Sequence, residues 1–147
     1  SAHEKGSAEK GIDIIRKYWQ NYEADSLELF MYDGSGLARN NKVSAKYLNC
    51  VLKETARDSL IGECFVQTLP LAGKEGSVTT FMKHGELPGE LRLKSGSMSD
   101  VHAYAGYYTT PQNRYAIVVM INNYTCTRAQ LKQKISTLLT QVLSKKE

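Results

Sequence analysis

The 147-residue sequence contains no apolar run that approaches the roughly 18 residues needed to cross a bilayer. Its three cysteines, Cys50, Cys64 and Cys126, cannot all pair within one molecule, and none has the spacing of a metal knuckle. We therefore expect buried thiols, no metal and no cofactor. No signal peptide opens the chain, so we expect either a cytoplasmic protein or one whose export signal has been removed.

A strong charge of either sign is also missing. Nineteen basic and fifteen acidic side chains give a net charge of +4, and the excess lies mainly near the end of the chain, at Lys132, Lys134, Lys145 and Lys146. A nucleic-acid-binding domain usually has a clustered basic stripe and a higher pI. We interpret these lysines as the solvated face of a helix and expect no nucleic-acid partner.

The composition that is present fits one globular domain. The hydrophobic content is 41% and the charged content 23%, which is ordinary for a folded chain and allows a core at this length. Apolar residues recur at three- and four-residue steps over 7–22 and 44–58, which predicts a helix in each stretch. Ser7 and Ser44 are suitable N-caps for these helices. Residues 27–32 are a short apolar run that breaks into Asp33-Gly34-Ser35-Gly36, which predicts a tight loop between the two helices.

Residues 69–90 contain most of the glycines and prolines and are predicted to form turns. Three strand-like runs follow at 91–94, 102–109 and 115–122, and the Pro111-Gln112-Asn113 turn makes neighbouring strands antiparallel. No repeat or low-complexity segment occurs.

A last helix is indicated by the capping-box pattern Thr127-x-x-Gln130. Its predicted inward face is Leu131, Ile135, Leu138 and Val142. The expected fold is therefore α+β, a three-stranded antiparallel sheet with flanking N- and C-terminal helices that cover one face of the sheet.

The tetrapeptide Lys94-Ser95-Gly96-Ser97 lies at the end of the first strand-like run and combines groups that suit acyl-transfer chemistry. The ammonium attracts an anionic substrate terminus, the serine hydroxyl can donate to it, and the glycine allows close approach of a substrate backbone. Backbone N–H groups at such an edge can stabilise an oxyanion by about 3–4 kcal/mol per donor. Taken alone, the tetrapeptide is more often a strand that ends in a turn.

Three further strings flank this tetrapeptide in the chain: Asp33-Gly34-Ser35-Gly36-Leu37, then Leu69-Pro70-Leu71-Ala72-Gly73 with Glu75-Gly76-Ser77, and finally Ala105-Gly106-Tyr107. The ordered set resembles the C-terminal part of the D-alanyl-D-alanine carboxypeptidase/endopeptidase family, the class C low-molecular-mass penicillin-binding proteins. The resemblance implies a β-lactamase/transpeptidase-like fold and a periplasmic or cell-envelope location. It also implies a serine acylated by the D-Ala-D-Ala end of peptidoglycan stem peptides, with β-lactams as further ligands.

Carried over by resemblance, Lys94, Ser95 and Gly96 match the family's Lys-Thr-Gly strand. The N–H of Ser97 matches the second oxyanion donor, and Asn40 matches the asparagine of the family's Ser-x-Asn loop. We therefore expect Lys94 and Asn40 to be catalytic, and Ser95, Gly96 and Ser97 to bind substrate.

The sequence departs from the family pattern at the Ser-x-Asn loop. Ala38 replaces the loop serine, so the hydroxyl that would relay a proton is absent, which leaves open whether turnover survives. Asn41 follows Asn40 directly, so either amide could take the family position. Glu75 and Ser77 replace the usual Asp and Thr, which are milder changes, and Ser35 is interpreted as a structural turn residue.

The nucleophile is the largest departure. Ser7-Ala8-Glu9-Lys10 fits Ser-x-x-Lys formally, but it opens the first helix, and in the family the nucleophile lies much further upstream of the Ser-x-Asn loop. We therefore expect residues 1–147 to be a C-terminal fragment of an exported enzyme, inactive alone, and to form a homodimer or swapped assembly. The alternatives are a non-catalytic module that binds peptidoglycan or a partner, and a purely structural domain.

The histidines and clustered tyrosines receive structural interpretations. His3, His84 and His102 lack the carboxylate spacing of a catalytic triad. Sheet packing explains four tyrosines better than a carbohydrate platform does: Tyr104, Tyr107, Tyr108 and Tyr115.

Overall fold

The computed structural model describes residues 6–22, 28–82 and 87–145. The chain divides into two compact units, Ser1–Glu54 and Thr55–Glu147. The helices and strands follow one another in this order: α1 (Ala8–Gln20), β1 (Leu29–Phe30), β2 (Lys42–Val43), α2 (Ala45–Arg57), α3 (Gly62–Thr68), the 3-10 helix η2 (Gly76–Val78), β3 (Glu90–Met98), β4 (Val101–Thr109), β5 (Arg114–Asn122) and α4 (Arg128–Leu143).

The first unit begins with α1, and both predicted serine caps are confirmed. The Ser7 hydroxyl accepts a hydrogen bond from the Lys10 N–H at 3.1 Å, and the Ser44 hydroxyl accepts one from the Tyr47 N–H at 2.9 Å. Each cap satisfies a donor at a helix start that has no partner inside the helix. The apolar run at 27–32 was predicted only to lead into a loop, yet its Leu29 and Phe30 form β1, which pairs with β2. Leu27 lies outside the described residues.

The apolar stripe of α1 is present but not buried. No residue of α1 is buried, and Ile14 and Tyr18 are 67% and 51% exposed. The rings of Tyr18, Trp19 and Tyr22 contact one another, with centroids 5.1–5.6 Å apart. A substantial apolar surface of the first unit therefore faces outward.

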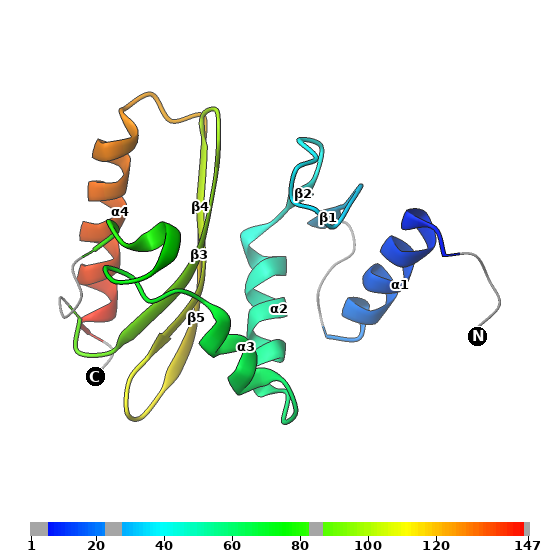
Figure 1. Ribbon diagram of the computed structural model, residues 1–147, viewed down its shortest axis with the longest axis horizontal. Coiled ribbons are helices and arrows are strands. Elements are labelled where there is room, and N and C mark those ends of the chain that lie inside the picture. Colours follow the sequence, from blue (N-terminus) through cyan, green and yellow to red (C-terminus); the bar gives the residue numbers. More distant parts are fainter. Residues whose placement is uncertain (1–5, 23–27, 83–86, 146–147) are drawn as a thin grey trace. The chain divides into compact units, whose positions relative to one another are not determined.

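The second unit contains the predicted three-stranded antiparallel sheet, in the order β3-β4-β5 (Figure 1). Lys94 pairs with Ala105, which in turn pairs with Val118. The prediction that the first strand ends at Lys94 was wrong, because pairing with β4 continues to Met98 opposite Val101. The tetrapeptide therefore lies within a strand.

Two tight turns set the register of this sheet. Ser99 and Asp100 connect β3 to β4, and Asp100 adopts a left-handed φ of 58°. The carbonyl of Asp100 accepts a hydrogen bond from the Asn123 N–H at 2.6 Å, which ties this turn to the end of β5. The predicted turn between β4 and β5 is confirmed by a 2.8 Å bond from the Thr110 N–H to the Asn113 carbonyl.

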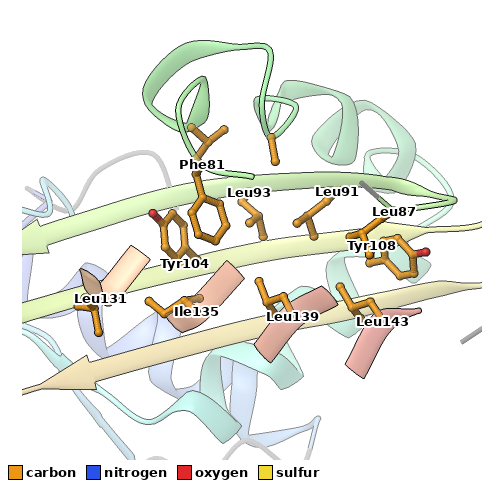
Figure 2. Close-up of a cluster of buried hydrophobic side chains, with 12 residues drawn as sticks. Phe81, Leu87, Leu91, Leu93, Tyr104, Tyr108, Leu131, Ile135, Leu139 and Leu143 are labelled. Atoms are coloured by element: carbon orange, nitrogen blue, oxygen red, sulfur yellow. The ribbon is translucent and has the colours of Figure 1, made fainter. Parts of the chain in front are cut away.

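The helix α4 covers one face of the sheet, and its predicted capping box is present (Figure 1). Figure 2 shows its side chains pointing toward those of β3 and β4, where Phe81 stacks on Tyr104 with a centroid separation of 4.0 Å. Leu139 and Leu143 occupy the core positions that we predicted for Leu138 and Val142, which are 52% and 47% exposed. The main buried residues of this core are Phe81, Leu91, Leu93, Tyr104, Tyr108, Leu131, Ile135, Leu139 and Leu143.

The helix α3 packs on the opposite face of the sheet. Its Phe65 makes an edge contact with Tyr107 at a centroid distance of 6.4 Å. An ion pair of 2.8 Å between Glu63 and Arg114 connects α3 to β5. The prediction that helices cover only one face was therefore wrong. Alternation of side chains along β4 explains this, since Tyr104 and Tyr107 point to opposite faces.

Candidate functional site

The outer edge of β3 is covered over only part of its length. The Leu93 N–H donates to the Pro70 carbonyl at 3.0 Å, and the Ala72 N–H donates to the Leu91 carbonyl at 2.8 Å. Because backbone groups alternate in direction along an antiparallel strand, the N–H and C=O groups of Ser95 and Ser97 face this same edge. In the described part of the chain, no strand pairs with the edge beyond Leu93.

The structure brings the four residues of the tetrapeptide together at this open edge. Lys94 Nζ donates to the Ser95 carbonyl at 2.7 Å, so the ammonium lies beside the exposed backbone. The side chains of Lys94 and Ser95 start on opposite faces of the strand. A Cβ atom built on Gly96 would meet nothing within 4 Å, which leaves open space for an approaching chain.

The hydroxyl of Ser95, the first serine of the tetrapeptide, has a partner that the sequence did not predict. Ser95 Oγ and Ser77 Oγ are 2.7 Å apart and form a hydrogen bond. Ser77 lies in η2, directly after Gly76, which has a left-handed φ of 51°. The sequence showed Ser77 only as a replacement for threonine in the motif, and its distance along the chain from Ser95 gave no signal of contact.

Arg92 anchors the segment that contains Ser77. Its guanidinium donates to the Leu69 carbonyl at 3.0 Å and lies 3.7 Å from the Glu75 carboxylate. The same carboxylate accepts the Leu71 N–H at 2.9 Å. Arg92 lies two residues before Lys94 on β3, and its side chain is only 16% exposed. The motif strings at 69–77 and 94–97 are therefore held together physically.

Asp33, Ser35 and Asn41 form a closed network in the loop of the first unit. Asn41 accepts the Tyr32 N–H at 2.8 Å and donates to the Asp33 carboxylate at 3.0 Å, while Ser35 donates to Asp33 at 3.0 Å. The Asn41 amide and then the Ser35 hydroxyl hold the pKa of Asp33 below its ordinary value. The interpretation of Ser35 as a structural turn residue agrees with this geometry.

Asn40 is exposed, and its side chain forms no hydrogen bond within the described residues. The neighbouring Asn41 amide is occupied by the loop, so Asn40 is the amide that remains available to a ligand. The Ala38 carbonyl accepts the Asn41 N–H at 3.1 Å, and the Ala38 backbone also bonds with the Asp33 carboxylate. Asn40 belongs to the first unit and Lys94 to the second.

The remaining candidate residues have structural roles. Ser7 is an N-cap, as predicted, rather than a free nucleophile. His102 is buried, and His3 and His84 lie outside the described residues. Burial raises the pKa values of Tyr104 and Tyr107 to about 12, so neither phenol exchanges a proton near neutral pH.

The described residues offer neither a metal site nor a membrane span. They contain no group of three or more His, Cys, Asp or Glu side chains placed to hold a metal ion. None of the helices within the described ranges is long and apolar enough to cross a membrane.

Comparisons with known proteins agree with the motifs. The D-Ala-D-Ala carboxypeptidase 3 (S13) family matches residues 1–145. A D-alanyl-D-alanine carboxypeptidase of an Actinomadura species is 27% identical over 124 residues, which is 81% of this chain and 23% of the relative. The carboxypeptidase DacB of Haemophilus influenzae is 31% identical over 112 residues, 73% of this chain and 23% of that protein. The chain thus spans about a quarter of these relatives' length.

Solved structures show the same partial correspondence. Penicillin-binding protein 4 (dacB) of Haemophilus influenzae, solved with a β-lactam, matches with a TM-score of 0.76 and 25% identity over 97% of this chain and 35% of that one. A predatory endopeptidase of Bdellovibrio bacteriovorus, solved with an immunity protein, shares the fold with a TM-score of 0.70 at 16% identity, over 90% of this chain and 37% of that one. The family inferred from the four motif strings is confirmed: the chain belongs to the D-Ala-D-Ala carboxypeptidase 3 (S13) family.

Proposed function

We propose that this chain is the C-terminal part of a serine-type D-Ala-D-Ala carboxypeptidase or endopeptidase that acts on peptidoglycan stem peptides. The observation that carries the proposal is the open edge of β3, where Lys94, Ser95, Gly96 and the outward N–H of Ser97 lie in sequence. An extended peptide can add to such an edge through backbone hydrogen bonds. The relative that was solved with a β-lactam supports β-lactams as ligands of the parent protein.

Each residue has a definite chemical task in this proposal. The Lys94 ammonium attracts the terminal carboxylate of the D-Ala-D-Ala peptide or assists acylation, and the Ser95 hydroxyl donates to the carboxylate. Gly96 lets the peptide backbone come close to the strand. The Ser97 N–H stabilises the oxyanion that forms when a serine attacks the penultimate D-Ala carbonyl. Asn40 orients the substrate amide.

The attacking serine is proposed to lie outside this chain. Ser7 is the only serine here that precedes a lysine at Ser-x-x-Lys spacing, and its oxygen caps α1. Attack by the upstream serine breaks the D-Ala-D-Ala peptide bond, releases the amine and leaves an ester on the serine, which water then hydrolyses. The parent protein acts in the periplasm or cell envelope, where this substrate is found.

Labelling with a fluorescent penicillin tests the proposal. The chain of residues 1–147 and the longer parent protein are each incubated with the probe, and adducts are located by mass spectrometry. We expect an adduct on a serine of the parent that lies outside residues 1–147, and none on the isolated chain. An adduct at Ser7 contradicts the proposal, and so does an unlabelled parent protein.

The second candidate function is a non-catalytic module that binds peptidoglycan or a protein partner. Ala38 favours it, because this position offers a methyl group where the family pattern has a hydroxyl. The same labelling separates the two functions. A parent that binds stem peptides but forms no acyl adduct, either as it stands or with Ala38→Ser, lacks the nucleophile as well and is a binding module.

A further inference from the structure

A groove with a volume of about 670 Å³ lies between residues 73–82 and the first turns of α4. Its walls carry two cations, Arg128 and Lys132, and several neutral hydrogen-bonding groups. The neutral polar lining residues are Thr79, Thr80, Gln133 and Ser136. The described lining includes no carboxylate that could neutralise these two cations. The groove therefore offers hydrogen-bond donors and a net positive charge.

The placement of these cations is unfavourable for the helix itself. α4 has Arg128, Lys132 and Lys134 in its first half, no acidic residue in its first turn and no basic residue in its last turn. The positive end of the helix dipole repels cations at the N-terminus. Arg128 and Lys132 are also four residues apart, where like charges face each other. Helix stability therefore does not account for this arrangement.

No counter-ion from the described residues compensates the two cations. Neither Arg128 nor Lys132 forms an ion pair within residues 6–22, 28–82 and 87–145. Their field reaches the neighbouring core, since burial and then the charges of Lys132 and Arg128 lower the pKa of His102. Leu131 and Ile135 fix the orientation of α4 by pointing into the core (Figure 2), so the cations remain at the groove.

We infer that this groove binds a carboxylate-bearing part of the peptidoglycan polymer, at a position separate from the edge of β3. The inference rests on the proposed function. An arginine fork, an ammonium and nearby hydroxyls together suit a carboxylate, which accepts several charge-assisted hydrogen bonds.

The location of the groove supports a polymeric ligand. The segment 73–82, which lines the groove through Gly73 and residues 79–82, also contains Ser77, whose hydroxyl bonds with Ser95 on β3. One segment of chain thus borders both the groove and the candidate catalytic strand. Peptidoglycan carries several stem-peptide carboxylates, so one stem can occupy the strand edge while a carboxylate of the same polymer occupies the groove.

Nuclear magnetic resonance of the ¹⁵N-labelled chain tests this inference. A stem pentapeptide with free side-chain carboxylates is titrated in, alongside an analogue in which those carboxylates are amidated. We expect shifts at Thr79, Thr80 and Lys132 with the free peptide only. The double variant Arg128→Gln/Lys132→Gln should weaken groove binding by about tenfold or more. Lys134→Gln removes the same charge from the same helix outside the groove and should leave binding unchanged.

Each outcome separates this inference from the proposed function. Shifts confined to residues 94–97 retain the proposed function and overturn the groove assignment. Shifts confined to the groove retain the groove and count against the strand edge, and shifts at neither place overturn both. Equal groove binding of the amidated peptide, or binding of poly(glycerol phosphate) without binding of the peptide, overturns the assignment to a peptidoglycan carboxylate.

Discussion

Ser77 Oγ and Ser95 Oγ lie 2.7 Å apart and connect a turn segment to the open strand of the candidate site. The contact joins two motif strings that are eighteen residues apart in sequence. A hydroxyl held by a neighbour loses less rotational freedom when a ligand binds, so the pair pre-orders the donor at the strand edge. Ser77 is therefore a positioning residue for Ser95.

Substitution of Ser77 tests this positioning role. Ser77→Ala should weaken binding of a D-Ala-D-Ala peptide to the chain by about fivefold, because one hydrogen bond is worth about 1 kcal/mol. Ser77→Thr keeps the hydroxyl and should restore affinity. Peptide titration monitored at the Ser95 and Gly96 amides gives the measurement. Equal weakening by both variants would show that Ser77 acts through loop structure alone.

Substitution by alanine should affect the stability of the chain very differently at two glycines of the sheet. A Cβ on Gly96 meets nothing within 4 Å, whereas a Cβ on Gly106 would lie 2.0 Å from the Arg92 carbonyl. Gly96→Ala should change the free energy of unfolding by less than about 0.5 kcal/mol and yet hinder the peptide at the strand edge. Gly106→Ala should destabilise by about 2 kcal/mol or more. Urea unfolding and peptide titration measure the two effects, and unhindered binding to Gly96→Ala argues against close approach.

Adjacent leucines on α4 provide a matched pair for the core. Leu139 is 5% exposed and Leu138 is 52% exposed. Leu139→Ala should lower the free energy of unfolding by about 2–5 kcal/mol, and Leu138→Ala by less than about 1 kcal/mol. Chemical denaturation followed by circular dichroism gives both values. The reverse order would show that α4 presents the face predicted from the sequence.

His102 should make the second unit less stable in acid. Burial, Lys132 and Arg128 lower its pKa from the ordinary 6.5. Between the folded pKa and 6.5 the unfolded chain binds more protons, so the free energy of unfolding falls as the pH decreases through this window. Replacing His102 with Leu should remove this part of the pH dependence in urea unfolding as the pH falls below about 6.5. An unchanged pH profile would contradict the assignment.

The exposed face of α1 and the outer edge of β5 should promote self-association. Ile14 is 67% exposed, and β5 pairs only with β4 among the described strands. An apolar helix face and an unpaired strand are both common contact surfaces. Sedimentation at micromolar concentration should show a dimer that Ile14→Lys weakens more than the control Lys17→Gln does. A monomer throughout this range contradicts the prediction.

Sequence reasoning succeeded where a single local interaction decides the structure. The caps at Ser7 and Thr127 and the turn at Pro111–Asn113 depend on residues within a few positions of one another. The motif strings likewise identified the family and the residues at the strand edge. These features needed no knowledge of long-range packing.

The errors arose where partners distant in sequence decide the outcome. Ser95 and Gly96 are weak strand formers, yet pairing with β4 keeps them extended. Leu138 and Leu139 are both apolar, so the pattern alone could not select the one that packs under the sheet. The seven-residue α3 is too short to show a helical period. The Ser77–Ser95 contact depends on how a turn folds back onto a strand.

The two-residue turn at Ser99 and Asp100 constrains which insertions this chain can accept. Exposed turns usually accept insertions, but here the pairing of Met98 with Val101 fixes which backbone groups of β3 point outward. A slip of one residue would exchange the roles of Lys94 and Ser95, turning the lysine's amide to the open edge and the serine's amide toward β4. The length of this turn therefore decides which backbone groups the open edge of β3 presents, although neither turn residue belongs to β3.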